Sequence, residues 1–264
     1  MNHFWHWHPS VVVGLAALVA SYAMGVRVVG RRQAVRPSEV IAFAGGVAAM
    51  AVALLGPLAE WAEHVALSAH MAQHLLLTLV VPPLWLAGTP PGLLRPALAL
   101  PGVRTAGRVL TRPAVALALA GAILALWHMP VLFEAALTSE DLHILEHLTL
   151  LGTGLLAWWP VAGRLPDWPR PAPPARLLYL FLCTVPMTLV AAPITLADRV
   201  LYPYYVQAGA AWPLAPRADQ ELAGVIMWIG GTLAYVIAGT VVFFRWANRE
   251  EPAEISAVTS LGQP

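Results

Sequence analysis

The sequence has no lysine, a single cysteine and few charged residues of either sign. Only 11% of its 264 residues are charged and 59% are hydrophobic, whereas roughly a quarter of the residues in a soluble domain are charged. This shortage of charge is typical of a chain that lies in a lipid bilayer. Because Cys183 is the sole cysteine, an intramolecular disulfide and a site built on two thiolates are excluded. A net charge of +1 offers no extended basic surface, so nucleic acid is not an expected partner.

Long apolar runs, in contrast, are abundant. A helix that crosses a bilayer needs about 20 mostly apolar residues, and seven runs approach or exceed this length: Ser10–Val29, Ser38–Leu58, Val65–Ala87, Pro113–Met129, Asp141–Ala162, Ala175–Ala197 and Glu221–Trp246. The sequence therefore predicts an all-α fold, a polytopic bundle of seven transmembrane helices within residues 1–248. Residues 249–264 are predicted to be a disordered cytoplasmic tail. The longest connections, 88–112 and 198–220, are rich in proline and glycine and are predicted to be surface loops.

The arginines predict how this bundle is oriented. Thirteen of the fifteen arginines fall in the first, third and fifth connections and the tail region, and Arg199 and Arg217 fall in the sixth connection. Short loops that carry positive charge stay in the cytoplasm. The amino terminus is therefore predicted to lie outside the cell and the carboxyl terminus inside.

With this topology, all nine histidines fall in the outer half of the protein. Two pairs have the spacing of one helical turn, His70 with His74 and His143 with His147, so the members of each pair share a helix face. A short outer connection brings His128 close to the second pair. Ionisable side chains at this depth usually face the interior of a bundle or a wet cavity. The five histidines are therefore predicted to form a metal site, and neutral histidines bonded between helices are the structural alternative.

Imidazole nitrogens bind zinc, copper, iron and nickel, so the histidines do not select one metal by themselves. The methionines Met71 and Met129 adjoin two of them and favour copper modestly, because thioethers select Cu(I). Glu146 lies beside two candidate ligands and could orient an imidazole. Together with His143 and His147 it also forms an HxxEH pattern, which is typical of zinc peptidases and leaves a membrane-embedded zinc hydrolase open. A haem protein with histidine axial ligands is a further alternative.

Several blocks of sequence, taken in order, resemble a known family. The blocks are His70-Met71-Ala72-Gln73-His74 followed by Pro82-Pro83, Trp127-His128-Met129-Pro130, His143 to His147, Leu201-Tyr202-Pro203-Tyr204-Tyr205, and Asp219 to Trp228. Through this ordered series of blocks, the chain resembles the multi-spanning cytochrome c oxidase assembly factor CtaG family of bacterial membranes. The likeness covers residues 60 to 246 approximately, and the first two predicted helices match in hydropathy alone.

The resemblance implies a multi-pass protein of the bacterial plasma membrane that helps copper reach a haem-copper oxidase, with oxidase subunits and the lipid bilayer as partners. It favours a binding and assembly protein over an enzyme. We expect the metal site to use His70, His74, His128, His143 and His147. Its supporting residues are expected to be Glu146, Asp219, Gln220 and Met227. Whether His3, His6 and His8 take part is left open.

Overall fold

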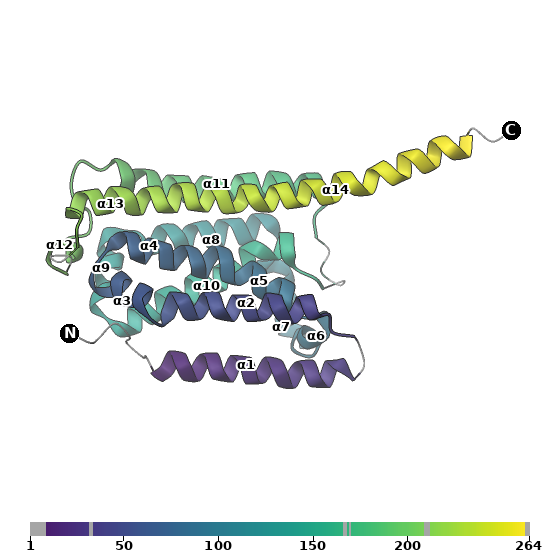
Figure 1. Ribbon diagram of the computed structural model, residues 1–264, viewed down its shortest axis with the longest axis horizontal. Helices are drawn as coiled ribbons and strands as arrows, with labels where there is room; N and C mark the ends of the chain where they lie inside the picture. The colour runs from purple at the N-terminus through teal and green to yellow at the C-terminus, as the bar shows by residue number, and fades with distance from the viewer. Residues whose placement is uncertain (1–8, 32–33, 166–167, 169, 209–211, 262–264) are drawn as a thin grey trace.

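The computed structural model describes residues 9–31, 34–165, 168, 170–208 and 212–261, and within these ranges every regular element is helical, with no β-strand. The all-α prediction is therefore confirmed (Figure 1). The elements in chain order are α1 (Pro9–Gly30), α2 (Pro37–Leu54), α3 (Pro57–His64), α4 (Leu67–Leu75), the π-helix η1 (Leu76–Val80), α5 (Val81–Gly88), α6 (Pro91–Leu98), α7 (Pro101–Leu110), α8 (Pro113–Trp127), α9 (Pro130–Thr138), α10 (Glu140–Ala162), α11 (Pro173–Leu196), α12 (Tyr204–Ala208), α13 (Pro216–Val225), the π-helix η3 (Ile226–Gly230) and α14 (Gly231–Leu261).

Proline defines where most of these helices begin. Nine of them start at a proline, among them α2, α8 and α11. The ring of proline fixes φ at a helical value, and its missing N–H is no loss in the first turn, where backbone donors have no partner within the helix. The many prolines of this chain thus mark helix starts rather than long irregular segments.

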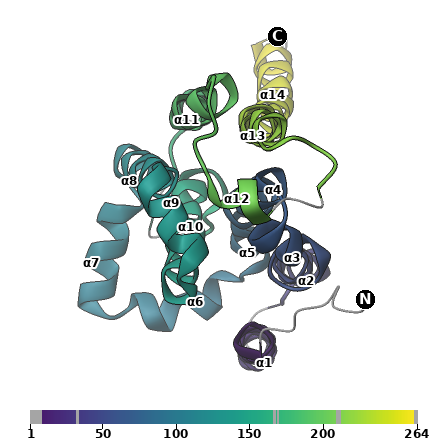
Figure 2. The same ribbon diagram turned by 90° about the vertical axis from the view of Figure 1, so that its left-hand side faces the viewer.

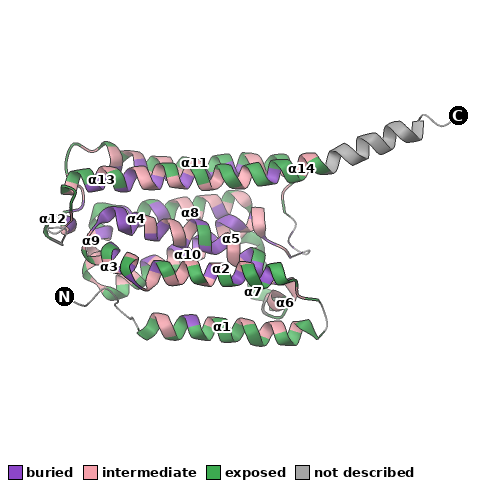
Figure 3. Ribbon diagram, viewed as in Figure 1, coloured by how far each residue is buried: buried purple, intermediate pink, exposed green. Residues whose placement is uncertain are grey.

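Two of the long rods contain a π-helical turn. Segments α4, η1 and α5 form one rod, and α13, η3 and α14 form another, which lies beside α11 (Figure 1). The rod of α4 packs against α10 on one side and α13 on the other, so it lies between them (Figure 2). Helix α1 lies at the edge of the molecule and buries only Leu15, whereas buried residues gather on α4 and on the inward sides of α5 and α10 (Figure 3).

The two ends of the bundle differ in the charged and ionisable residues that they carry. We call the end at which α9 and α12 lie the histidine end, and the end at which α6 and α7 lie the arginine end (Figure 1). The site predicted from the histidines lies near the first of these ends. The connections that carry most of the arginines lie at the other.

Five helical segments of the described chain are long and apolar enough to cross a bilayer: Pro9–Gly30, Pro37–Leu54, Leu67–Gly88, Pro173–Leu196 and Pro216–Asn248. A sixth is reached if α7 and α8, bent by 79° at their junction, count as one span. Helix α10 has 23 residues but is not among them, and its first turns carry acids and histidines. A membrane protein of several helices is thus supported. The number seven, the orientation and the boundary at residue 248 stay predictions.

The first of the two predicted surface loops is largely helical. Residues 91–98 and 101–110 form α6 and α7, and the second connection contains α12 and the start of α13. Proline and glycine were the signal for loops, but Pro91 and Pro101 each stand at the first position of a helix, where proline is favoured. Helix α7 buries none of its residues in the bundle.

Candidate metal centre

His70 and His74 lie on α4, one turn apart, and both side chains are almost completely buried, with 0% and 2% exposure. The start of α4 is held by Asp219 of α13. Its carboxylate accepts hydrogen bonds from the backbone N–H groups of Leu67, at 2.7 Å, and Ser68, at 3.3 Å, and from the Ser68 hydroxyl at 2.5 Å. The first amides of a helix have no partner within it, and a carboxylate there also interacts favourably with the helix dipole. Asp219 thereby fixes the helix that carries both histidines.

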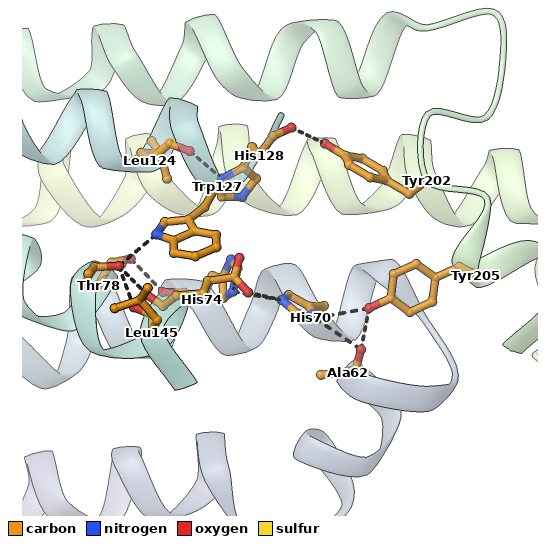
Figure 4. A network of polar contacts seen from close by, with 12 residues as sticks. Ala62, His70, His74, Thr78, Leu124, Trp127, His128, Leu145, Tyr202 and Tyr205 are labelled. Carbon is orange, nitrogen blue, oxygen red and sulfur yellow. Dashed lines mark hydrogen bonds and ion pairs between the residues drawn. The ribbon is translucent and has the colours of Figure 1, made fainter. Parts of the chain in front are cut away.

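The two imidazoles point toward one another. A hydrogen bond of 2.9 Å joins the Nε2 atoms of His70 and His74, and it is one of the contacts drawn in Figure 4. On the other side of the His70 ring, Nδ1 lies 3.3 Å from the carbonyl oxygen of Ala62 and 3.1 Å from the Tyr205 hydroxyl, which itself donates to Ala62 at 2.5 Å. A carbonyl oxygen can only accept, so Nδ1 of His70 carries the proton. The lone pair of His70 is therefore on Nε2 and faces His74.

Helix α10 adds Glu146 and His147 to this pair. Glu146 is fully buried, and its carboxylate oxygens lie 3.6 Å from Nε2 of His74 and 3.9 Å from Nε2 of His70. Within the described chain, neither oxygen accepts a hydrogen bond, and Nε2 of His147 has no hydrogen-bond partner. A buried carboxylate without a hydrogen bond is costly, and such groups are usually paired or bound to a metal.

One ligand atom from each of His70, His74, Glu146 and His147 lies within 4.8 Å of the others. With metal–nitrogen bonds of about 2.0 to 2.1 Å, two adjacent ligand atoms on one ion lie about 3 Å apart. The 2.9 Å between the Nε2 atoms of His70 and His74 fits this spacing. The set of three imidazoles and one carboxylate can therefore close around a single ion with small side-chain movements, and its donors suit zinc, copper or iron.

The other two predicted ligands flank this group. The ring of His128 is 5.4 Å from that of His74, centre to centre, and His143 is 4.3 Å from His147 and 5.5 Å from His70. Nδ1 of His128 donates to the Leu124 carbonyl at 2.7 Å, which leaves its Nε2 as an acceptor without a hydrogen bond from the described residues. The structure thus brings all five predicted histidines together, three in the compact group and two beside it.

Two tyrosines between α11 and α13 hold the histidines in place, one in the loop after α11 and one in α12. Tyr202 donates a hydrogen bond to the carbonyl oxygen of His128 at 2.8 Å, and Tyr205 lies against His70 (Figure 4). Burial raises the pKa of both phenols above their usual value of 10, so both remain protonated donors. These roles were not predicted, although the block from Leu201 to Tyr205 contributed to the family resemblance. The Ala62 carbonyl gives no signal in a sequence.

The four predicted supporting residues differ in how directly they contact the group of potential ligands. Glu146 belongs to the donor set itself. Asp219 acts on the backbone of α4 and not on an imidazole. Gln220 accepts from the backbone N–H of Leu201 at 2.6 Å and donates to the carbonyls of Arg199 and Ile194, so it ties the loop with the tyrosines to α11. Met227 is buried in the hydrophobic core. His3, His6 and His8 lie outside the described residues.

A cavity of about 330 Å³ adjoins the group at the histidine end. His143 and His147 line it, together with the acids Glu63 and Glu140 and the half-exposed side chain of His64. Carboxylates around a hollow raise the local concentration of cations. The buried donor set is therefore connected, through His147, to a space that attracts metal ions.

Comparisons with known proteins agree with the likeness noted in the sequence. A family model described as cytochrome c oxidase caa3 assembly factor (Caa3_CtaG) matches residues 20–249. Among curated proteins, uncharacterized proteins of Mycobacterium bovis and Mycobacterium tuberculosis are each 26% identical over 265 residues, covering 92% of this chain. The chain spans only 40% of the length of these relatives. No solved structure matches.

Proposed function

The chain belongs to the family of cytochrome c oxidase caa3 assembly factors, and on that basis we propose that it holds a metal ion at His70, His74, Glu146 and His147 and aids its insertion into the oxidase. Copper is the favoured ion, because the resemblance implies an assembly role in which copper reaches a haem-copper oxidase. The methionines add little to this choice, since Met71 and Met227 are buried in the hydrophobic core. The expected partners are subunits of the oxidase.

The observation that carries the proposal is the convergence of four potential metal ligands, in which the oxygens of Glu146 and Nε2 of His147 have no hydrogen bond from the described chain. The Nε2 atoms of His70 and His74 share one hydrogen bond at 2.9 Å, and the fully buried Glu146 lies within 4 Å of both without accepting a hydrogen bond from the described chain. In an arrangement of purely structural histidines, such groups would be satisfied by one another or by the backbone. A cation relieves all of these costs at once.

Transfer of an ion requires that it can leave as well as bind. His143 and His128 lie beside the donor set and could accept the ion in turn, because ligand exchange between neighbouring imidazoles breaks one bond as another forms. His143 also lines the cavity at the histidine end. We infer that the ion passes from the buried group by way of His143 toward the partner.

Metal analysis of the purified protein tests the site. The full-length chain, extracted in mild detergent, is expected to retain close to one equivalent of copper, and the variant His70→Ala/His147→Ala is expected to retain almost none. His64→Ala is the matched control, since it removes an imidazole outside the donor set. Equal copper in the double variant and the parent would refute the site, provided that circular dichroism shows unchanged helix content.

Oxidase activity in cells tests the assembly role separately. Deletion of the gene is expected to lower the activity of the copper-containing oxidase in copper-poor medium, and added copper is expected to restore part of it. If activity were unchanged in both media, the assembly role would be wrong even with a genuine metal site. The double variant should behave as the deletion does.

The two chemical alternatives find less support in the geometry. In a zinc peptidase with an HxxEH motif both histidines bind the metal, but here the compact group contains His147 with the two histidines of α4, and His143 stands beside it. A haem places its two axial ligands on opposite faces of the ring. The Nε2 atoms of His70 and His74 are too close, at 2.9 Å, for a macrocycle to lie between them.

A further inference from the structure

A second and larger cavity lies at the arginine end, on the far side of the bundle from the histidines. Its volume is about 580 Å³, and α2, α5, α10, α11 and α14 supply most of its walls. Five of the lining residues are arginines from separate parts of the chain: Arg36, Arg164, Arg170, Arg176 and Arg245. The proposed metal transfer uses none of them.

The charge of this cavity is strongly unbalanced. Of the described residues that line it, Glu39 is the one carboxylate, and Arg164 pairs with it at 2.6 Å. Arg164 also donates to the Ala87 carbonyl at 3.0 Å, which ties it to the end of α5. The lining therefore keeps an excess of four positive charges over negative ones. Like charges gathered around a hollow repel one another, and a bound anion removes that cost.

The backbone adds to the positive potential. Helices α2 and α11 both begin at the cavity, where Ser38 and Pro173 contribute to the lining. The amino terminus of a helix carries a partial positive charge and free N–H groups, and it attracts phosphate in many proteins. At α2 the Glu39 carboxylate accepts a hydrogen bond from the backbone N–H of Arg36, at 2.9 Å, whereas no side chain caps the terminus of α11 in the described structure.

The remaining wall of the cavity is apolar. Ala238, Val241 and Val242 of α14 face it, with Pro83 of α5 and Trp158 of α10. The indole N–H of Trp158 is already used in a hydrogen bond to the Thr78 carbonyl, so the ring presents only its hydrocarbon surface. A small hydrophilic anion would gain nothing from contact with an apolar wall. A molecule with a charged head group and a hydrocarbon chain matches both the arginines and the apolar wall.

We propose that this cavity binds an anionic phospholipid, with the phosphodiester of its head group among the arginines and an acyl chain along α14. The guanidinium group forms paired hydrogen bonds with phosphate oxygens, so arginine suits this role better than lysine would. The cavity lies at the end of the spans α2, α11 and α14, which is the level of lipid head groups. Basic pockets between transmembrane helices are known to bind such head groups. This inference is independent of the proposed metal site.

Native mass spectrometry of the full-length protein in detergent can test the proposal. The protein is titrated with phosphatidylglycerol and with phosphatidylcholine that has the same acyl chains, and the phosphatidylglycerol is expected to bind more tightly. The variant Arg170→Gln/Arg245→Gln, which leaves the pair of Arg164 and Glu39 intact, is expected to weaken phosphatidylglycerol binding about thirtyfold, since each arginine near a head group contributes about fivefold. Its binding of phosphatidylcholine, whose choline cation balances the charge of the phosphodiester, should change much less.

The matched control is Arg31→Gln/Arg108→Gln, which removes the same charge from exposed positions outside the cavity lining. Equal affinity of the parent for the two lipids, or an equal loss in the control, would overturn the proposal. Displacement of the lipid by millimolar inorganic phosphate would show that the site serves a free anion and would also overturn it. If the double variant loses helix content by circular dichroism, Arg245→Gln alone replaces it, with an expected loss of about fivefold.

Discussion

Glu146 is a carboxylate enclosed by imidazole rings, and its charge has opposite consequences for stability and for binding. Without a cation it is a buried carboxyl group that accepts no hydrogen bond from the described residues, which costs folding free energy. With a cation it becomes a ligand. Residues of this kind are retained for function at the expense of stability.

We therefore expect Glu146→Gln to leave the metal-free protein at least as stable as the parent and to lower its affinity for copper about 10- to 100-fold, a loss typical when a metal site is altered. Thermal unfolding with and without copper checks both effects. In the parent, copper at 100 times its dissociation constant should stabilise the fold by about 2.7 kcal/mol, and the variant should show much less. Glu221→Gln, which removes an exposed acid paired with Arg217, is the control. A metal-free variant less stable than the parent would contradict the prediction.

Tyr205 acts through His70 and not on the ion. Its hydroxyl lies 3.1 Å from Nδ1 of His70 and donates to the Ala62 carbonyl, and these contacts fix the ring and its protonation. Tyr205→Phe is expected to weaken copper binding about tenfold, measured by competition with a chelator of known affinity. Tyr204→Phe, on the adjacent residue, should leave the affinity unchanged. The same affinity in both variants would mean that the hydroxyl of Tyr205 does not orient His70.

At the scale of elements, α4 depends on α13 for its amino-terminal end. Asp219 supplies the hydrogen bonds that the sequence before α4 lacks, since residue 66 at the N-cap position is alanine. Asp219→Ala is expected to cost about 1 to 2 kcal/mol of unfolding free energy, as the loss of a helix cap does, and to increase hydrogen exchange at the first amides of α4. Asp198→Ala, an exposed acid after α11, should have no such effect. Unchanged exchange in α4 would show that Asp219 does not cap it.

In the rod α4–η1–α5, two prolines follow the π-helical turn and remove backbone hydrogen bonds from it. The carbonyl of Thr78 would bond to the N–H of residue 82 in an α-helix or of residue 83 in a π-helix, but both are prolines. The indole N–H of Trp158 donates to this carbonyl instead, at 3.0 Å. The rod that carries the site is thus joined to α10, the helix that carries Glu146.

A double-mutant cycle can measure this link. Trp158→Phe should cost about 1 to 3 kcal/mol, because it leaves a buried carbonyl unsatisfied. In a Pro82→Ala background the same change should cost less, since residue 82 then offers an N–H to Thr78. Chemical unfolding of the four proteins gives the coupling. Additive effects would show that Trp158 contributes through packing alone.

At the scale of the whole molecule, the separation of histidines and arginines between the two ends predicts how the protein lies in the membrane. Because the native Cys183 is buried, a cysteine introduced at an exposed site can be labelled selectively. In intact cells, a membrane-impermeant maleimide is expected to label His64→Cys and to label Arg108→Cys only after the membrane is permeabilised. The opposite pattern would reverse the predicted orientation and place the metal site on the cytoplasmic side.

Hydropathy and helical spacing in the sequence were enough to predict an all-helical membrane protein and the two histidine pairs. Both are local properties, because a 20-residue apolar run and a separation of four residues have the same meaning in any chain. The same reasoning failed for 91–98 and 101–110, where prolines at helix starts resembled those of loops.

The composition of the metal site was decided by the tertiary structure. Only the packing of the rod α4–η1–α5 against α10 shows that His147 and Glu146 join His70 and His74 while His143 stands beside them. Likewise, Asp219 and Tyr205 lie 152 and 135 residues from the groups they contact on α4. Contacts over such separations depend on how whole helices pack, and no local pattern in the chain records them.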